Sequence, residues 1–112
     1  MIMDRKEILA RKLKALFPEE HERAQVLATL ETYGAGKHEQ EPDRVRLAVL
    51  KLSGGDLKQI QRYTAFAKQD FRDILTWAEY PRQSKKWSMP DGPKKRKLAE
   101  ADRAEYEDWL SR

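Results

Sequence analysis

Residues 42–81, PDRVRLAVLKLSGGDLKQIQRYTAFAKQDFRDILTWAEYP, decide the fold of this chain. The stretch holds three largely apolar sets, each spaced at or near i, i+3, i+4, i+7, which is the period of a helix that buries one side. The sets are Val45, Ala48, Val49 and Leu52; Leu57, Ile60, Thr64 and Ala67; and Phe71, Ile74, Leu75 and Ala78. We therefore predict helices over 42–52, 57–68 and 71–79. The first is predicted to be central, because Leu47 and Leu50 add apolar groups outside its main stripe.

Capping residues divide this stretch. Gly54 and Gly55 end the first helix, because glycine accepts a left-handed backbone at little cost, and Asp56 caps the second. A further capping residue, Asp70, predicts a break between the second and third helices. One continuous helix over 57–79 is the competing interpretation, and in either case Pro81 ends the region.

Two more helices are predicted upstream. The first runs from residue 3 or 4 to 16, with Asp4 and Glu7 in the spacing of a capping box. The second begins at Pro18, where the missing N–H does no harm, and ends before Gly34. Apolar spacing supplies their buried sides: Ile8, Leu9, Leu13, Leu16 and Phe17 in the first, and Val26, Leu27, Leu30 and Tyr33 in the second.

The fold class that follows is all-α. We predict a compact bundle of four to five short helices over residues 1–81, a basic linker over 82–97 and an acidic C-terminal helix over 98–112. A length of 112 residues fits one domain, and no stretch alternates with the period of two that strands need. The helix itself could span residues 94–111, and the sequence leaves open whether it docks on the bundle.

Two motifs within this region carry a resemblance. Residues 44–56 (RVRLAVLKLSGGD) and 70–81 (DFRDILTWAEYP) resemble a family of small bacterial all-helical proteins with no assigned function, and the likeness covers roughly residues 18–81. Both are packing and capping motifs. The resemblance implies an all-helical domain of bacterial, cytoplasmic origin, and it implies no activity.

Charge is distributed unevenly along the chain. Residues 1–81 are nearly neutral, with 14 basic and 13 acidic side chains, whereas 82–97 carry seven basic and one acidic, and 98–112 carry two basic and five acidic. A basic tract beside an aromatic side chain suits a nucleic-acid backbone with a stacked base, and it equally suits an acidic protein or a solvated linker. Weak, sequence-tolerant nucleic-acid binding is the alternative function; its candidate residues are Arg82, Lys85, Lys86, Lys94, Lys95, Arg96 and Lys97.

The three tryptophans are the candidate residues for binding a protein partner. Trp77 is offset by one position from the apolar stripe of its helix, which places it at the edge of the core, and Trp87 and Trp109 lie in the tail. Exposed large apolar groups mark interaction sites, whereas docked ones belong to the fold. A non-enzymatic protein–protein interaction module, with a partner that the sequence does not identify, is therefore the leading interpretation.

No catalytic or metal-binding pattern accompanies these features. The chain has no cysteine, and its two histidines, His21 and His38, lie on different predicted elements without ligand spacing. We therefore expect no enzyme, no metal and no cofactor. A helix-turn-helix over 44–67 is disfavoured, because only two of its five outward residues are basic. The longest apolar run, 47–50, is far too short for a membrane span, so we expect a cytoplasmic protein.

Overall fold

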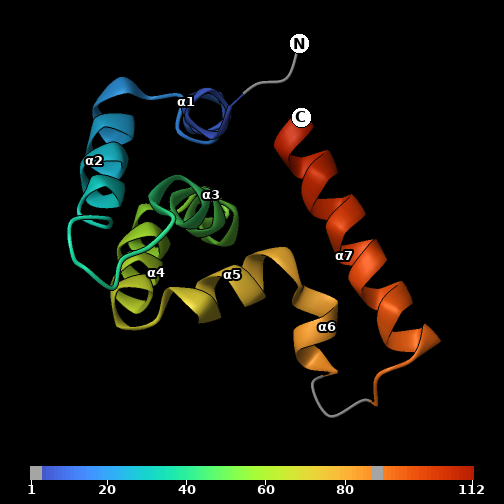
Figure 1. Cartoon of the computed structure of the whole chain (residues 1–112). Coiled ribbons are helices and arrows are strands. Elements are labelled where there is room, and N and C mark those ends of the chain that lie inside the picture. The colour runs from blue at the N-terminus through green and yellow to red at the C-terminus, as the bar shows by residue number, and fades with distance from the viewer. Residues whose placement is uncertain (1–3, 87–89) are drawn as a thin grey trace.

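Helices make up the regular structure of this protein (Figure 1). The computed structural model describes residues 4–86 and 90–112, and within those ranges it contains no strand, so the all-α prediction is confirmed. The helices are α1 (Arg5–Leu16), α2 (Glu20–Glu31), α3 (Pro42–Ser53), α4 (Leu57–Gln69), α5 (Phe71–Glu79), α6 (Pro81–Lys85) and α7 (Pro93–Ser111).

Helix α3 is the centre of the bundle. It packs against α1, α2, α4 and α5, which surround it in Figure 1. It is buried over most of its circumference, because apolar residues lie on nearly every side of it: Val45, Leu47, Ala48, Val49 and Leu50 are each at most 1% exposed. Side chains of the neighbouring helices complete the core, among them Leu30, Ile60 and Ile74, together with Phe17 directly after α1.

The predicted caps form. Asp4 accepts the N–H of Glu7 at 2.9 Å, Asp56 that of Lys58 at 2.8 Å, and Asp70 that of Arg72 at 3.0 Å. Asp70 has extended backbone angles (φ −156°, ψ 102°), so α4 and α5 are separate helices and the continuous alternative is wrong. After α3, Gly54 takes the left-handed conformation with φ +60°, as helix termination at that position requires.

The start of α2 differs from the prediction. The helix begins at Glu20 instead of Pro18, because the Glu19 carboxylate caps it by accepting the N–H groups of His21 at 2.9 Å and Glu22 at 2.6 Å. Those bonds lower the pKa of Glu19. Pro18 therefore lies just before the cap.

The C-terminal third also differs from the prediction, because most of the expected linker is helical. Helix α6 starts at Pro81, and α7 starts at Pro93, five residues before the predicted acidic segment 98–112 and one residue before the longer helix predicted over 94–111. Each proline occupies the first helical position, where it needs no N–H partner and its fixed φ suits a helix. Helix α7 packs against α1, α5 and α6. Although it is 19 residues long, it is highly charged, and no helix in the described residues has the length and apolar character needed to cross a membrane.

Candidate functional site

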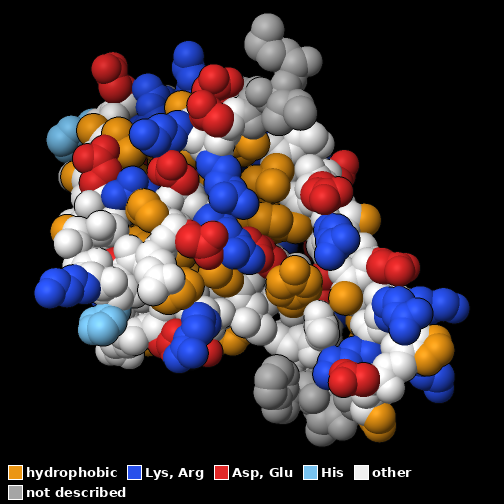
Figure 2. Space-filling model, viewed as in Figure 1, with side chains coloured by type: hydrophobic (Ala, Val, Ile, Leu, Met, Phe, Trp, Pro, Cys, Tyr) orange, Lys and Arg blue, Asp and Glu red, His pale blue; other side chains and the backbone are white. Residues whose placement is uncertain are grey.

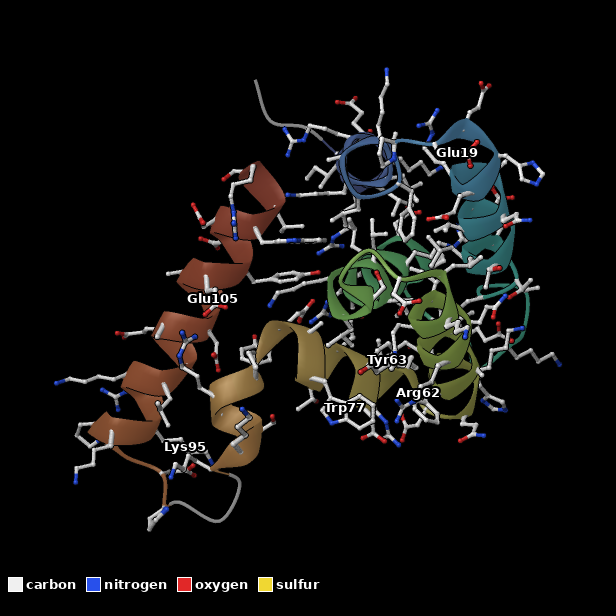
Figure 3. All side chains as sticks on the ribbon, turned by 180° about the vertical axis from the view of Figure 1, so that it is seen from behind. Glu19, Arg62, Tyr63, Trp77, Lys95 and Glu105 are labelled. Atoms are coloured by element: carbon white, nitrogen blue, oxygen red, sulfur yellow. The ribbon has the colours of Figure 1, made fainter. Side chains whose placement is uncertain are left out.

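Three aromatic side chains form a cluster on α4 and α5, which we call the aromatic surface: Tyr63, Phe66 and Trp77. Their ring centroids lie 6.2–6.5 Å apart with interplanar angles of 67–82°, the edge-to-face arrangement that aromatic quadrupoles favour. Trp77 is 41% exposed, while the other two rings are half-buried. Figure 3 shows Tyr63 and Trp77 side by side.

The aromatic surface rests on a rigid support. Ile60 and Ala67 on α4, and Ile74 and Ala78 on α5, are buried beneath it in the core. The guanidinium of Arg62 lies over two of its rings, 5.9 Å from the centroid of Tyr63 and 5.5 Å from that of Phe66. The surface can therefore bind an apolar group next to a fixed positive charge.

The other two tryptophans have different positions. The ring of Trp109 is half-buried, stacks on Tyr106 at 5.7 Å and lies 4.6 Å from the Lys12 ammonium. It therefore helps to join α7 to α1, and the structure does not bring it to the aromatic surface. Trp87 lies outside the described residues.

Five of the predicted nucleic-acid-binding residues gather where α6 ends and α7 begins, which Figure 1 shows as neighbouring ends of two helices. We call this region the basic end. Its side chains are exposed and come from the last turn of α6 or just after it, and from the first turn of α7: Lys85, Lys86, Lys94, Arg96 and Lys97.

The remaining two predicted residues are committed to ion pairs. Arg82 contacts Asp102 at 3.1 Å and also pairs with Glu105, and these hydrogen bonds, that of Glu105 foremost, raise the pKa of its guanidinium. Lys95 pairs with Asp91 at 3.1 Å. Both side chains therefore already have anionic partners within the chain.

Asp102 is a polar residue that sequence reasoning missed. Its side chain is completely buried and accepts three hydrogen bonds: the N–H of Arg82 at 3.2 Å, the N–H of Gln83 at 3.0 Å and the Arg82 guanidinium. The two backbone donors belong to the first turn of α6, which no neighbouring side chain caps. The N-cap residue of α6, Tyr80, makes no capping bond, so Asp102 supplies that bond from a helix twenty residues further along the chain.

A cleft of about 210 Å³ lies between α7 and the bundle. Figure 2 shows the surface hollowed there. Its wall includes Arg44, which the Glu79 carboxylate holds with two bonds of 2.8 and 2.6 Å. These bonds raise the pKa of Arg44. Tyr106 also lines the cleft, and burial raises the pKa of its phenol, whose hydroxyl has no hydrogen-bond partner among the described residues.

Both histidines are exposed, as expected. His38 borders a polar hollow beside the junction of α4 and α5, with Lys68 and Asp70 in its wall. Across residues 4–86 and 90–112 there is no group of three histidine, aspartate or glutamate side chains placed to hold a metal ion.

Comparisons with known families, with curated proteins and with solved structures each returned no match to this chain. The resemblance of residues 18–81 to bacterial helical proteins therefore stays a prediction, and function has to be argued from the surfaces described above.

Proposed function

We propose that this protein is a non-enzymatic interaction module that binds a protein partner through the aromatic surface. The observation that carries the proposal is the exposure of Trp77, which at 41% leaves a large indole in solvent above a packed core. Tryptophan is among the residues that contribute most to protein interfaces, because it buries a large area with little loss of side-chain entropy.

The chemistry of the aromatic surface defines the partner. An apolar side chain can pack edge-on to Trp77 and Tyr63, and the exposed Arg62 favours a carboxylate beside it. We therefore expect a partner segment that carries an apolar or aromatic residue next to an acidic one. Because Trp77 is already exposed, binding needs no rearrangement of α4 or α5.

The experiment compares two exposed apolar residues of the same chain. Trp77 and Leu27, which is 38% exposed on α2, are each replaced by a photo-crosslinking phenylalanine analogue. Crosslinking in cell extract is followed by mass spectrometry of the adducts. A partner is expected to crosslink from position 77 and to be absent from position 27.

A substitution then tests the same surface. Trp77→Ala should lower the affinity for the crosslinked partner at least tenfold, because truncating a central aromatic residue costs about 2 kcal/mol or more. Leu27→Ala should lower it less than twofold. Equal crosslinking from both positions, or an affinity that Trp77→Ala leaves unchanged, contradicts the proposal.

A second candidate function, weak binding of nucleic acid, is favoured by the charge order of α7. The first turn of this helix carries basic residues and no acidic one, and its last turn carries no basic residue. That order opposes the helix dipole, whose positive end lies at the N-terminus. The chain thus keeps Lys94, Arg96 and Lys97 where they lower helix stability, and a phosphate backbone at the basic end would offset that cost.

Salt dependence tests this second candidate. About five phosphate contacts predict a log–log slope of the association constant against salt of about −3.5 for a single strand and −4.5 for duplex DNA. Neutralising Lys94, Arg96 and Lys97 to glutamine should roughly halve the slope, while neutralising the exposed Lys6, Lys14 and Lys37 should leave it unchanged. The absence of any shift in gel mobility at about 50 mM salt rules this function out.

A further inference from the structure

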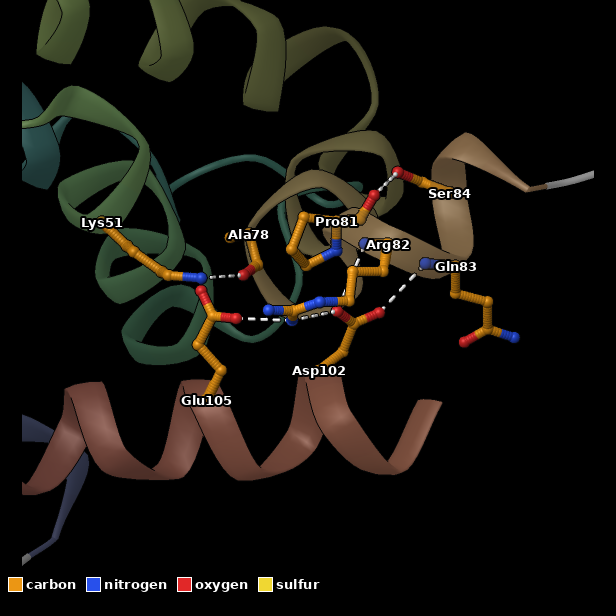
Figure 4. A network of polar contacts seen from close by, with 8 residues as sticks. All are labelled: Lys51, Ala78, Pro81, Arg82, Gln83, Ser84, Asp102 and Glu105. Carbon is orange, nitrogen blue, oxygen red and sulfur yellow. Dashed lines mark hydrogen bonds and ion pairs between the residues drawn. The ribbon is translucent and has the colours of Figure 1, made fainter. Parts of the chain in front are cut away.

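Helix α7 is held by polar contacts with other helices at its middle and at its C-terminal end. Near its middle, Asp102 caps α6, and the neighbouring Glu105 pairs with Arg82; Figure 4 shows this network together with Lys51, which donates to the Ala78 carbonyl at 2.7 Å. At the C-terminal end, the main-chain oxygens of Leu110 and Arg112 accept hydrogen bonds from Arg11 and Lys12 of α1. These cations complement the negative end of the helix dipole, which α7's own sequence does not.

Between these caps the contact is thin. Only Asp102 and Tyr106 of α7 are buried, and the cleft described above, with a neighbouring hollow of about 430 Å³ beside α6, runs along one side of the helix. The Tyr106 hydroxyl is enclosed there without a hydrogen-bond partner among the described residues. Trp109 and Leu110 pack, partly buried, against the core at the C-terminal end of α7. Along the rest of the helix, docking depends on polar and charged contacts.

The surface that α7 covers is cationic. We call it the cationic groove and define it by four residues: Arg11, Lys12, Lys51 and Arg82. Burial lowers the pKa of Lys12 and of Lys51, and the nearby Arg112 guanidinium acts in the same direction. Carboxylates of α7 oppose the shift: Asp108 near Lys12, and Glu105 and Asp102 near Lys51. The groove is thus complementary in charge to the C-terminal part of α7, because residues 98–112 carry two basic and five acidic side chains.

We propose that the cationic groove is a second protein-binding site, in which α7 acts as an internal ligand that an acidic amphipathic helix of a partner protein displaces. The recognised pattern is that of α7 itself: an acidic residue that caps α6, a tyrosine four positions later, and Trp-Leu at seven and eight positions, as in Asp102, Tyr106, Trp109 and Leu110. This site is separate from the aromatic surface and does not depend on it.

Such a site is controlled by competition between the chain's own helix α7 and the helix of a partner protein. Because α7 is tethered, it competes at an effective concentration in the millimolar range. A free helix with the same intrinsic affinity for the groove therefore binds weakly while α7 is docked. Any change that weakens docking of α7 but leaves the groove intact must therefore strengthen binding of the free helix. Asp102→Asn is such a change, because the α6 N–H groups and Arg82 remain available to the aspartate of an incoming helix.

The experiment uses the full chain and a fluorescein-labelled peptide of residues 93–112, with binding followed by fluorescence anisotropy. The peptide is expected to bind the Asp102→Asn chain about five- to tenfold more tightly than the wild-type chain, the factor that corresponds to loss of one helix cap. A chain carrying Glu100→Gln, which removes an exposed carboxylate of the same helix, should match the wild type. A peptide that itself carries Asp102→Asn should bind every chain more weakly than the unchanged peptide does, by a similar factor.

Two outcomes overturn the proposal. If the peptide binds the Asp102→Asn chain no better than the wild type, although circular dichroism shows equal helix content, then α7 does not occupy an exchangeable site. If light scattering shows that the wild-type chain dimerises at the same concentrations and that Asp102→Asn abolishes the dimer, the occupant is the α7 of a second copy.

Discussion

Replacing Asp102 by alanine should destabilise the protein by about 2 kcal/mol. The substitution removes three hydrogen bonds and leaves the first turn of α6 without a cap. Loss of a cap costs about 0.5–2 kcal/mol, typically about 1 kcal/mol. The bond to Arg82 adds little, because that side chain is 48% exposed and its charge is screened by solvent. The complete burial of the Asp102 side chain places its loss at the upper end of the range for a cap.

Thermal unfolding followed by circular dichroism measures this cost. At about 2.1 cal/mol/K per residue, the unfolding entropy of the 112 residues is about 0.24 kcal/mol/K, so 2 kcal/mol lowers Tm by about 8 °C. The Tm of Asp102→Asn should lie between those of the wild type and Asp102→Ala, since the amide oxygen can still accept one backbone N–H. Glu100→Ala, on the exposed face of the same helix, should stay within about 2 °C of the wild type. An Asp102→Ala midpoint inside that margin refutes the capping argument.

Three further substitutions test the packing and the charges. Leu50→Ala leaves a cavity in the completely buried centre of α3 and should cost about 2–5 kcal/mol in urea unfolding; a loss below about 1 kcal/mol places α3 at the periphery. Tyr106→Phe removes a buried hydroxyl that has no partner in the described residues, so stability should be unchanged or higher by up to about 1 kcal/mol; a clear loss would reveal a bond to that oxygen. Burial lowers the pKa of Lys12, so in the alkaline range below the usual lysine pKa of 10.5 the unfolded chain binds more protons than the folded one. Stability should therefore rise with pH in that range, and less steeply in Lys12→Met; an equal slope in both proteins excludes Lys12 as the cause. Above about pH 10 the trend should reverse, because burial raises the pKa of Tyr33 to about 12 and also raises that of Tyr106.

The bundle could be predicted from local sequence because its signals are local. The stripes of α3, α4 and α5 follow the helical period, and each cap acts within three residues: Asp4, Asp56 and Asp70 all accept N–H groups two or three positions later. Trp77 was placed at the edge of the core by its offset from the stripe, and the structure confirms that position.

The C-terminal third could not be predicted in the same way because its contacts are long-range. Asp102 caps α6 from twenty residues away, and Arg11 and Lys12 contact α7 from about a hundred residues away. A composition that reads as a basic linker therefore folds as two helices, since the groups that complete them lie elsewhere in the chain. The clustering of Tyr63 and Phe66 with Trp77 likewise depends on how α4 packs against α5.

Native-state hydrogen exchange tests most directly whether α7 opens independently of the bundle around α3. We predict that amides in 98–110 open with a smaller free energy than those in 45–52, because α7 buries only two side chains whereas α3 buries six. Asp102→Asn should lower the opening free energy of α7 further than it lowers that of α3. Equal opening free energies in the two helices, shifted together by Asp102→Asn, would contradict the account.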